Sequence, residues 1–224
     1  HLLFDHDVTI DLNGRTISST ELSGRSEELR IGFKAGYTPA VCTVVLCGSG
    51  TVKCGVFVGG NAALQVYDAP EFTGTVSMEA GTVAVGDDQR PSAAAFAAID
   101  VKEQGKLDMR HWTGTAAEIR LSEPTAAAYI GGGRVERLEL GYTYNSTSGD
   151  RAALQLSGGE YNAIYFLLNG APAGLYCIGD LLAPGYALEH FTGTDPETGE
   201  DVRVLAPYGD NSFDPNLSTI QEVK

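Results

Sequence analysis

The sequence predicts an all-β solenoid, a fold in which short strands stack coil upon coil around one continuous core. Three observations support this prediction. A pattern of apolar, any, apolar and then small or polar residue recurs along the chain. From Val44 onward it begins at residues 44, 64, 83, 99, 119, 138 and 154, in steps of 20, 19, 16, 20, 19 and 16. Finally, 28 of the 224 residues are glycine, against about 7% in average proteins, and they stand beside short apolar segments, where tight turns are expected.

The repeat also predicts which side chains face inward. Side chains alternate between the two faces of a strand, so the first and third positions of each repeat should share one face. A unit of this size cannot bury that face alone, but stacked units form a common core. The middle position is polar in six of the eight instances and should face outward. The predicted inward ladder consists of Ile10, Leu12, Val44, Leu46, Leu64, Val66, Val83, Val85, Ile99, Val101, Ile119, Leu121, Leu138, Leu140, Leu154 and Leu156.

A second set of short strands begins at glycine, as in Gly50-Thr51-Val52, Gly74-Thr75-Val76 and Gly105-Lys106-Leu107. Each period therefore holds at least two strands. The alternative is a β-sandwich, whose strands also recur regularly. The steps of the repeat are longer than a hairpin, which favours the solenoid. So does the scarcity of the hairpin dipeptides Asn-Gly and Asp-Gly, which occur only at Asn13-Gly14 and Asn169-Gly170.

The segment Ile10-Asp11-Leu12-Asn13-Gly14, the repeated Gly-Thr-Val strands and the Gly-Gly turns resemble a known class of domains. These are right-handed parallel β-helix domains of the pectate-lyase-like class, in particular those of large secreted or wall-attached bacterial surface proteins. Residues 178–187 are similar to a stretch that closes the solenoid in those proteins. The resemblance covers roughly residues 8–190. It implies a right-handed parallel β-helix with a C-terminal capping segment, in which residues 180–187 could form one helical turn.

The expected organisation is a solenoid with its cap over residues 1–190 and an acidic hairpin and linker over residues 191–224. Residues 192–201 are acidic and turn-like, and Val202-Arg203-Val204-Leu205 would be the return strand of that hairpin. The chain opens with His1-Leu2-Leu3 and shows no signal peptide. We therefore expect a piece of a longer secreted or cell-wall-attached protein, with neighbouring domains of the same polypeptide as partners.

Charge excludes two classes of partner. Fifteen Lys and Arg residues against 29 Asp and Glu residues give a net charge of −14. Nucleic acid needs a basic face, so nucleic-acid binding is excluded, and basic docking on an anionic membrane is disfavoured for the same reason. The longest apolar runs are far short of the roughly 20 residues of a membrane-spanning helix, so membrane insertion is not expected.

The four cysteines stand at positions 42, 47, 54 and 177. Their spacing does not match the short Cys-x2-Cys knuckles of structural zinc sites, and no metal or cofactor is expected. By strand alternation, Cys42 and Cys54 share a side with Val44 and Val52, which predicts buried apolar fillers. Free buried thiols are the favoured interpretation, and a disulfide between any pair stays open.

Four segments interrupt the regular spacing: residues 18–28, 87–92, 110–113 and 142–150. Binding sites concentrate on loops held by a rigid scaffold, and Trp and Tyr are enriched where partners are recognised. The candidate binding residues are Trp112, Tyr142, Tyr144 and Tyr67. The expected ligand is a host glycan or an extracellular host protein.

An alternative catalytic site consists of Asp87, Asp88 and Arg90. Gly86-Asp87-Asp88 resembles the signature of polygalacturonase-like hydrolases, in which paired carboxylates activate water and protonate the leaving oxygen. The later His-Gly and Arg-Ile-Lys parts of that signature are missing. An acidic turn on an acidic protein is therefore the simpler interpretation.

Asp100 and Arg120 occupy the outward middle position of successive repeats. They could belong to a lyase site, but a cross-strand ion pair explains them more simply. The sequence thus predicts a non-catalytic binding or adhesion module of a bacterial surface protein. The alternatives are a polysaccharide lyase or glycoside hydrolase acting on acidic or plant-type polysaccharide, and a purely structural solenoid.

Overall fold

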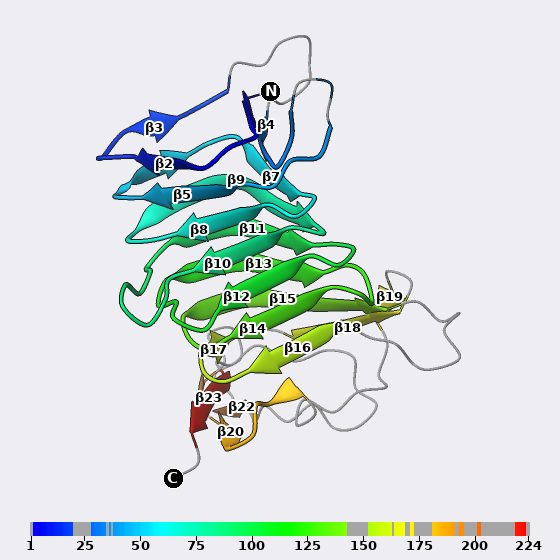
Figure 1. Cartoon of the computed structure of the whole chain (residues 1–224). Helices are drawn as coiled ribbons and strands as arrows, with labels where there is room; N and C mark the ends of the chain where they lie inside the picture. The colour runs from blue at the N-terminus through cyan, green and yellow to red at the C-terminus, as the bar shows by residue number, and fades with distance from the viewer. Residues whose placement is uncertain are drawn as a thin grey trace.

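Mostly parallel strands in two stacked sheets make up the described part of the protein (Figure 1). The computed structural model describes residues 2–19, 28–34, 36, 38–142, 152–162, 164–168, 171–172, 181–190, 193–194, 201–202 and 218–222. These residues contain almost no helix, and none long and apolar enough to cross a membrane. The predicted all-β, solenoid-like architecture is confirmed.

The smaller sheet runs down one side of the stack. It contains β2 (Val8–Asp11), β5 (Thr43–Cys47), β8 (Ala63–Val66), β10 (Thr82–Val85), β12 (Lys106–Met109), β14 (Ala127–Ile130) and β16 (Ala153–Leu156). Every neighbouring pair in this sheet is parallel.

The larger sheet has 14 strands in the described residues. Its central strands, in parallel register from coil to coil, are β1 (Leu2–Phe4), β4 (Glu28–Ile31), β7 (Gly55–Gly59), β9 (Pro70–Glu79), β11 (Ala95–Val101), β13 (Thr115–Leu121), β15 (Arg134–Tyr142) and β17 (Glu160–Tyr161). Attached to them are β3 (Thr16–Ile17), β6 (Gly50–Val52), β18 (Ile164–Leu168), β19 (Ala171–Pro172), β20 (Tyr186–His190) and β23 (Ser218–Glu222).

The structure shows which steps of the sequence pattern are full coils. In the smaller sheet Val83 pairs in register with Leu107, Leu107 with Ala128, and Ala128 with Leu154. These three coils are longer than any step of the sequence pattern. The pattern's own steps from Val44 to Leu64 and from Ile99 to Ile119 also pair in register, so they too are full coils. The shortest steps of that pattern, such as Val83 to Ile99, cross from one sheet to the other. The steps of 20 and 19 residues are therefore confirmed as coil-to-coil steps, whereas the steps of 16 residues cross between the sheets, and one period does not describe both.

The predicted inward ladder is confirmed. Fifteen of its 16 members are buried, and the remaining one, Ile10, is partly buried and packs against the same core. Ile10 lies on β2, at the end of the smaller sheet, so a strand covers it on one side only. A single hydrophobic core runs through the stack between the two sheets.

The cysteines add to this core. Cys42, Cys47 and Cys54 are buried free thiols, which confirms the placement of Cys42 and Cys54 as core fillers. Burial raises the pKa of both these thiols. Cys177 lies outside the described residues.

The last coil is closed by the segment after residue 180. Leu181 and Ala183 are buried, and the Ala183 N–H donates to the Leu156 carbonyl at 2.8 Å. Residues 182–187 form a bridge, a turn and the start of β20. Of the helical turn expected over residues 180–187, the described residues show a 3₁₀ conformation at Leu181 only. The expectation is wrong over residues 182–187, because the chain there continues the β ladder onto β16.

The C-terminal residues return to the larger sheet. Strand β23 pairs antiparallel with both β17 and β20. Strands β21 (Gly193–Thr194) and β22 (Asp201–Val202) form an antiparallel pair, as the expected hairpin requires. Its tip, residues 195–200, lies outside the described residues.

Truncating the ladder should be costly. Ile119 is fully buried in β13, and Ile119→Ala should lower the free energy of unfolding by about 2–5 kcal/mol through lost burial and a residual cavity. Urea denaturation measures this directly. The matched control is Thr115→Ala, at an exposed position of the same strand, which should change stability by less than about 0.5 kcal/mol. Equal effects in both variants would contradict the assigned register.

Candidate functional site

A polar cluster lies on one edge of the stack, where the chain leaves the smaller sheet. Tyr67 and Asp68 follow β8 directly, and Asp87 and Arg90 belong to the turn after β10. Because Val66 pairs with Val85 in register, the two turns lie in adjacent coils. The structure thus brings together Tyr67, expected to bind a ligand, and two residues of the alternative catalytic set.

The carboxylate of Asp87 holds its own turn closed. Its Oδ1 accepts hydrogen bonds from the backbone N–H groups of Gln89, at 2.9 Å, and Arg90, at 2.8 Å. Such side-chain-to-backbone bonds are the usual means by which Asp stabilises a turn. Its Oδ2 accepts a hydrogen bond of 2.9 Å from the Tyr67 hydroxyl in the previous coil. Both oxygens are therefore engaged.

Asp68 and Arg90 form a two-point ion pair between coils. The Arg90 Nε–Asp68 Oδ1 distance is 3.1 Å, and the Nη2–Oδ2 distance is 2.6 Å. Asp68 Oδ2 also accepts the Gly48 N–H at 2.8 Å. The Arg90 Cζ lies 4.9 Å from the centroid of the Tyr67 ring, a cation–π geometry. The guanidinium thus connects the carboxylate to one face of the phenol.

Asp88 and His111 extend the cluster to the next coil. The Asp88 Oδ1–His111 Nε2 distance is 3.0 Å, and the Asp88 side chain is 82% exposed. Gly86 makes this approach possible, because a Cβ there would lie 2.6 Å from the His111 carbonyl oxygen. The φ of Gly86, +74°, also favours glycine.

The electrostatics of the cluster favour fixed charges over proton transfer. The hydrogen bond from Arg90 and that from the Gly48 N–H lower the pKa of Asp68. The hydrogen bond from Tyr67, followed by those from two backbone N–H groups, lowers the pKa of Asp87. A glycosidase needs one carboxylic acid with a raised pKa to protonate the leaving oxygen. Neither Asp68 nor Asp87 meets that requirement.

Trp112 is not on the surface, so its expected role as an exposed recognition residue is wrong. Its side chain is 1% exposed, and its Nε1–H donates to the Ala94 carbonyl at 2.8 Å. Its ring packs against Phe96, with centroids 6.4 Å apart, and Phe96 stacks on Phe72 at 4.8 Å. The segment 110–113 therefore turns its largest side chain into the core.

Small neighbours admit the Trp112 ring. A Cβ at Gly133 would lie 2.4 Å from the Trp112 Cε3, and one at Gly114 would lie 2.7 Å from its Nε1. Ala116, in the same coil as Trp112, pairs in register with Phe96 and is also small. The indole thus occupies volume that small residues leave open.

The remaining candidate residues lie at or beyond the limits of the described chain. Tyr142 is the last residue of β15. Tyr144 lies outside the described residues, as do residues 143–150 and residues 20–27 of the first excursion.

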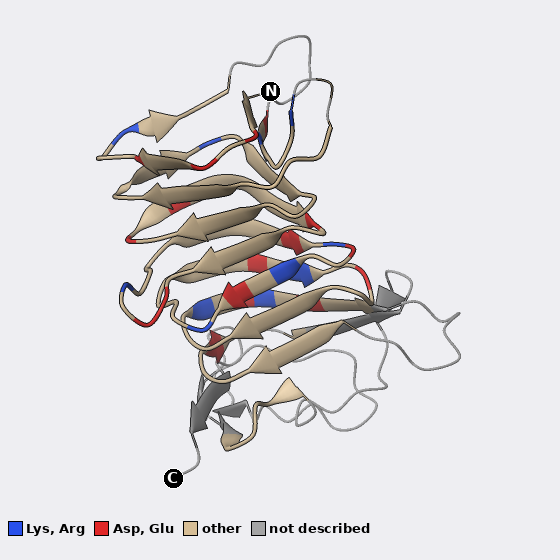
Figure 2. Cartoon of the chain, in the orientation of Figure 1, with Lys and Arg blue, Asp and Glu red and all other residues tan. Residues whose placement is uncertain are grey.

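Asp100 and Arg120 do stack in register, but Arg120 forms its ion pairs with other carboxylates. Its Nε lies 2.7 Å from Oε2 of Glu139, which is 2% exposed and also paired with Arg137. Burial tends to raise the pKa of Glu139, but hydrogen bonds from both arginines outweigh it and the pKa is lowered. Figure 2 shows the acidic and basic residues interleaved on these middle strands. This row is a structural ion-pair ladder.

Sequence reasoning missed Asp68 and did not assign His111 to the site, although the repeat held the signal. Gly48, Asp68 and Asp87 each stand four residues after the first apolar residue of their repeats, and His111 stands four after Leu107. The four residues therefore occupy one place in four successive coils. Tyr129, 40% exposed with the Arg110 Cζ 5.7 Å from its ring centroid, was also missed.

Comparisons of the chain with protein-family models, with curated proteins and with solved structures gave no match. Within the described part of the chain, no three His, Cys, Asp or Glu side chains are grouped so that they could hold a metal ion.

The lowered pKa values predict an acid-labile contribution to stability. Because Asp68 and Asp87 titrate lower in the folded than in the unfolded protein, their contribution is present above about pH 4 and is lost as the pH falls through the folded-state values. Between pH 5 and pH 2.5, the Tm of Asp68→Asn and of Asp87→Asn should therefore fall by less than the Tm of the parent protein. Glu71→Gln, at an exposed position, is the control and should follow the parent. A parallel fall in all four proteins would contradict the assignment.

Trp112 is the only tryptophan, so its environment can be read without labelling. Its emission should be blue-shifted in the folded protein and should shift to the red only in the unfolding transition. Trp112→Ala should lower the free energy of unfolding by about 3–5 kcal/mol. Emission typical of a solvated indole in the native protein would show that the ring is not in the core.

Proposed function

We propose that this chain is a right-handed parallel β-helix that serves as a non-catalytic binding or adhesion module of a secreted or wall-attached bacterial surface protein. Crossovers between parallel strands are right-handed in about 98% of cases, which supports the handedness. The observation that carries the proposal is the mutual pairing of Tyr67, Asp68, Asp87 and Arg90. Pre-formed polar groups on a rigid scaffold suit recognition, whereas catalysis requires a group free to exchange a proton.

Of the two ligand classes expected, a host protein is favoured over a glycan. Sugar rings stack on exposed aromatic faces, but Trp112 is buried and Arg90 covers one face of Tyr67. What this edge offers instead is an arginine, a tyrosine and exposed carboxylates. Tyr and Arg are enriched among the residues that dominate protein interfaces.

One observation favours the polysaccharide lyase or hydrolase. Asp88 and His111 form a carboxylate–imidazole pair at 3.0 Å, and a carboxylate that orients a histidine is a common arrangement for a general base. In that case Asp88→Asn or His111→Ala would abolish cleavage of acidic polysaccharides, measured as new reducing or unsaturated ends.

The proposal is tested by screening the immobilised chain against host extracellular proteins and a glycan array. For the protein captured, Arg90→Ala should weaken binding at least tenfold, because arginine is among the residues whose truncation costs an interface most. Arg15→Ala, which removes the same charge at an exposed position, should leave binding within about twofold. Capture of glycans alone would overturn the preference for a protein. Polysaccharide cleavage that depends on His111, or no binding in either screen, would overturn the proposal itself.

A further inference from the structure

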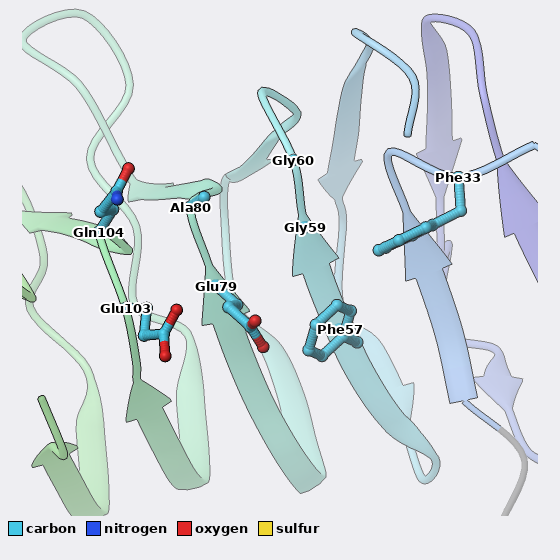
Figure 3. Close-up of a pocket in the computed structure, with 8 residues that line it drawn as sticks. All are labelled: Phe33, Phe57, Gly59, Gly60, Glu79, Ala80, Glu103 and Gln104. Atoms are coloured by element: carbon cyan, nitrogen blue, oxygen red, sulfur yellow. The ribbon is translucent and has the colours of Figure 1, made fainter. Parts of the chain in front are cut away.

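A groove lies on the opposite edge of the stack, where the chain leaves the larger sheet (Figure 3). Its volume is about 230 Å³. It spans successive coils, since its residues follow β4, β7, β9 and β11. The residues that matter for its chemistry are Phe33, Phe57, Gly59, Glu79, Glu103 and Gln104.

Two phenylalanines form its apolar wall. The centroids of the Phe33 and Phe57 rings lie 5.6 Å apart. Gly59 allows this arrangement, because a Cβ there would lie 2.4 Å from the Cζ of Phe33. The Arg30 Cζ lies 5.2 Å from the Phe57 centroid, so one ring of the wall already accepts a guanidinium. The negative face of an aromatic ring attracts cations in this way.

Two carboxylates continue the groove beyond the rings. Glu79 and Glu103 are exposed and lie on neighbouring coils, and Figure 3 shows them in line with Phe57. No described cationic side chain forms an ion pair with either of them. They contrast with Asp68, Asp108 and Glu139, whose carboxylates each pair with an arginine.

The backbone that carries these carboxylates is held in an unusual conformation. Ala80 and Gln104, the residues that follow them, have φ values of +56° and +52°, which side-chain-bearing residues seldom adopt. The Ala80 N–H donates to the Glu103 carbonyl at 2.7 Å, and Ala80 forms a bridge with Gly59. Strain of this kind tends to persist where a binding surface is built.

We propose that this groove binds an arginine or lysine side chain of a protein partner, with the alkyl stem against Phe33 and the charged end at Glu79 and Glu103. The ligand chemistry follows from charge complementarity, because an aromatic wall beside two carboxylates that no described cation pairs selects a cation with an apolar stem. The net charge of −14 attracts such a partner over longer distances. The inference rests on the proposed function in treating the chain as a protein-binding module, and it adds a second site on the other edge.

The test uses an acetylated and amidated peptide of alternating arginine and serine, with a citrulline peptide as the neutral counterpart. Affinities are measured by calorimetry at fixed ionic strength. The arginine peptide should bind, and the citrulline peptide should bind at least tenfold more weakly. Glu79→Gln combined with Glu103→Gln should weaken arginine-peptide binding at least tenfold. Phe33→Ala should also weaken it, while Phe33→Tyr, which keeps the ring, should retain it.

A matched control separates the groove from general charge attraction. Glu71→Gln combined with Glu123→Gln removes the same two charges outside the groove, and should leave the affinity within about twofold. An equal loss in both double variants, or no binding of the arginine peptide by the folded parent, would overturn the proposal. Circular dichroism is used to check that each variant is folded before its affinity is compared. Arg90 lies outside this groove. Loss of host-protein binding in Arg90→Ala therefore tests the proposed function, whereas loss of arginine-peptide binding in the Glu79 and Glu103 double variant tests this groove.

Discussion

The constraint on which this structure depends is that each coil must superpose on the next. Parallel backbone pairing fixes the register from coil to coil, so a side chain on an inner strand of either sheet has a neighbour at the same place in the next coil. Side chains that face inward therefore stack in apolar rows, as Ile99, Ile119 and Leu138 do. Outward places become rows in which charge must alternate, because like charges directly opposite each other are unfavourable.

The same constraint governs the outer face of the larger sheet. Glu139 tolerates burial only because Arg120 and Arg137 meet it from its own strand and the neighbouring one. Removing one partner of a buried pair leaves an uncompensated charge, and this destabilises the folded protein far more than the intact pair stabilises it. The two arginines of this row therefore compensate the buried carboxylate on the outer face of the larger sheet.

The two edges differ in how their charges are used. On the edge after the smaller sheet, Asp68 pairs with Arg90 across coils, and Asp87 accepts hydrogen bonds from Tyr67 of the neighbouring coil and from its own turn. On the edge after the larger sheet, Glu79 and Glu103 lie beside two phenylalanine rings without such partners among the described residues. A rigid stack can hold both arrangements because turns vary in sequence while the strands beneath them keep their register.

The β class, the inward ladder and the burial of Cys42 and Cys54 could be predicted from the sequence, because the alternation of side chains along a strand depends only on neighbouring residues in the chain. The three-dimensional arrangement was needed to tell which steps of the pattern run from coil to coil and to place Trp112. Whether an indole faces solvent depends on the space that Gly114, Gly133 and Ala116 leave for it. The partners Asp68 and Arg90, and the groove between Phe33 and Glu103, likewise join residues from different coils. Their contacts depend on which turns lie side by side when the coils stack.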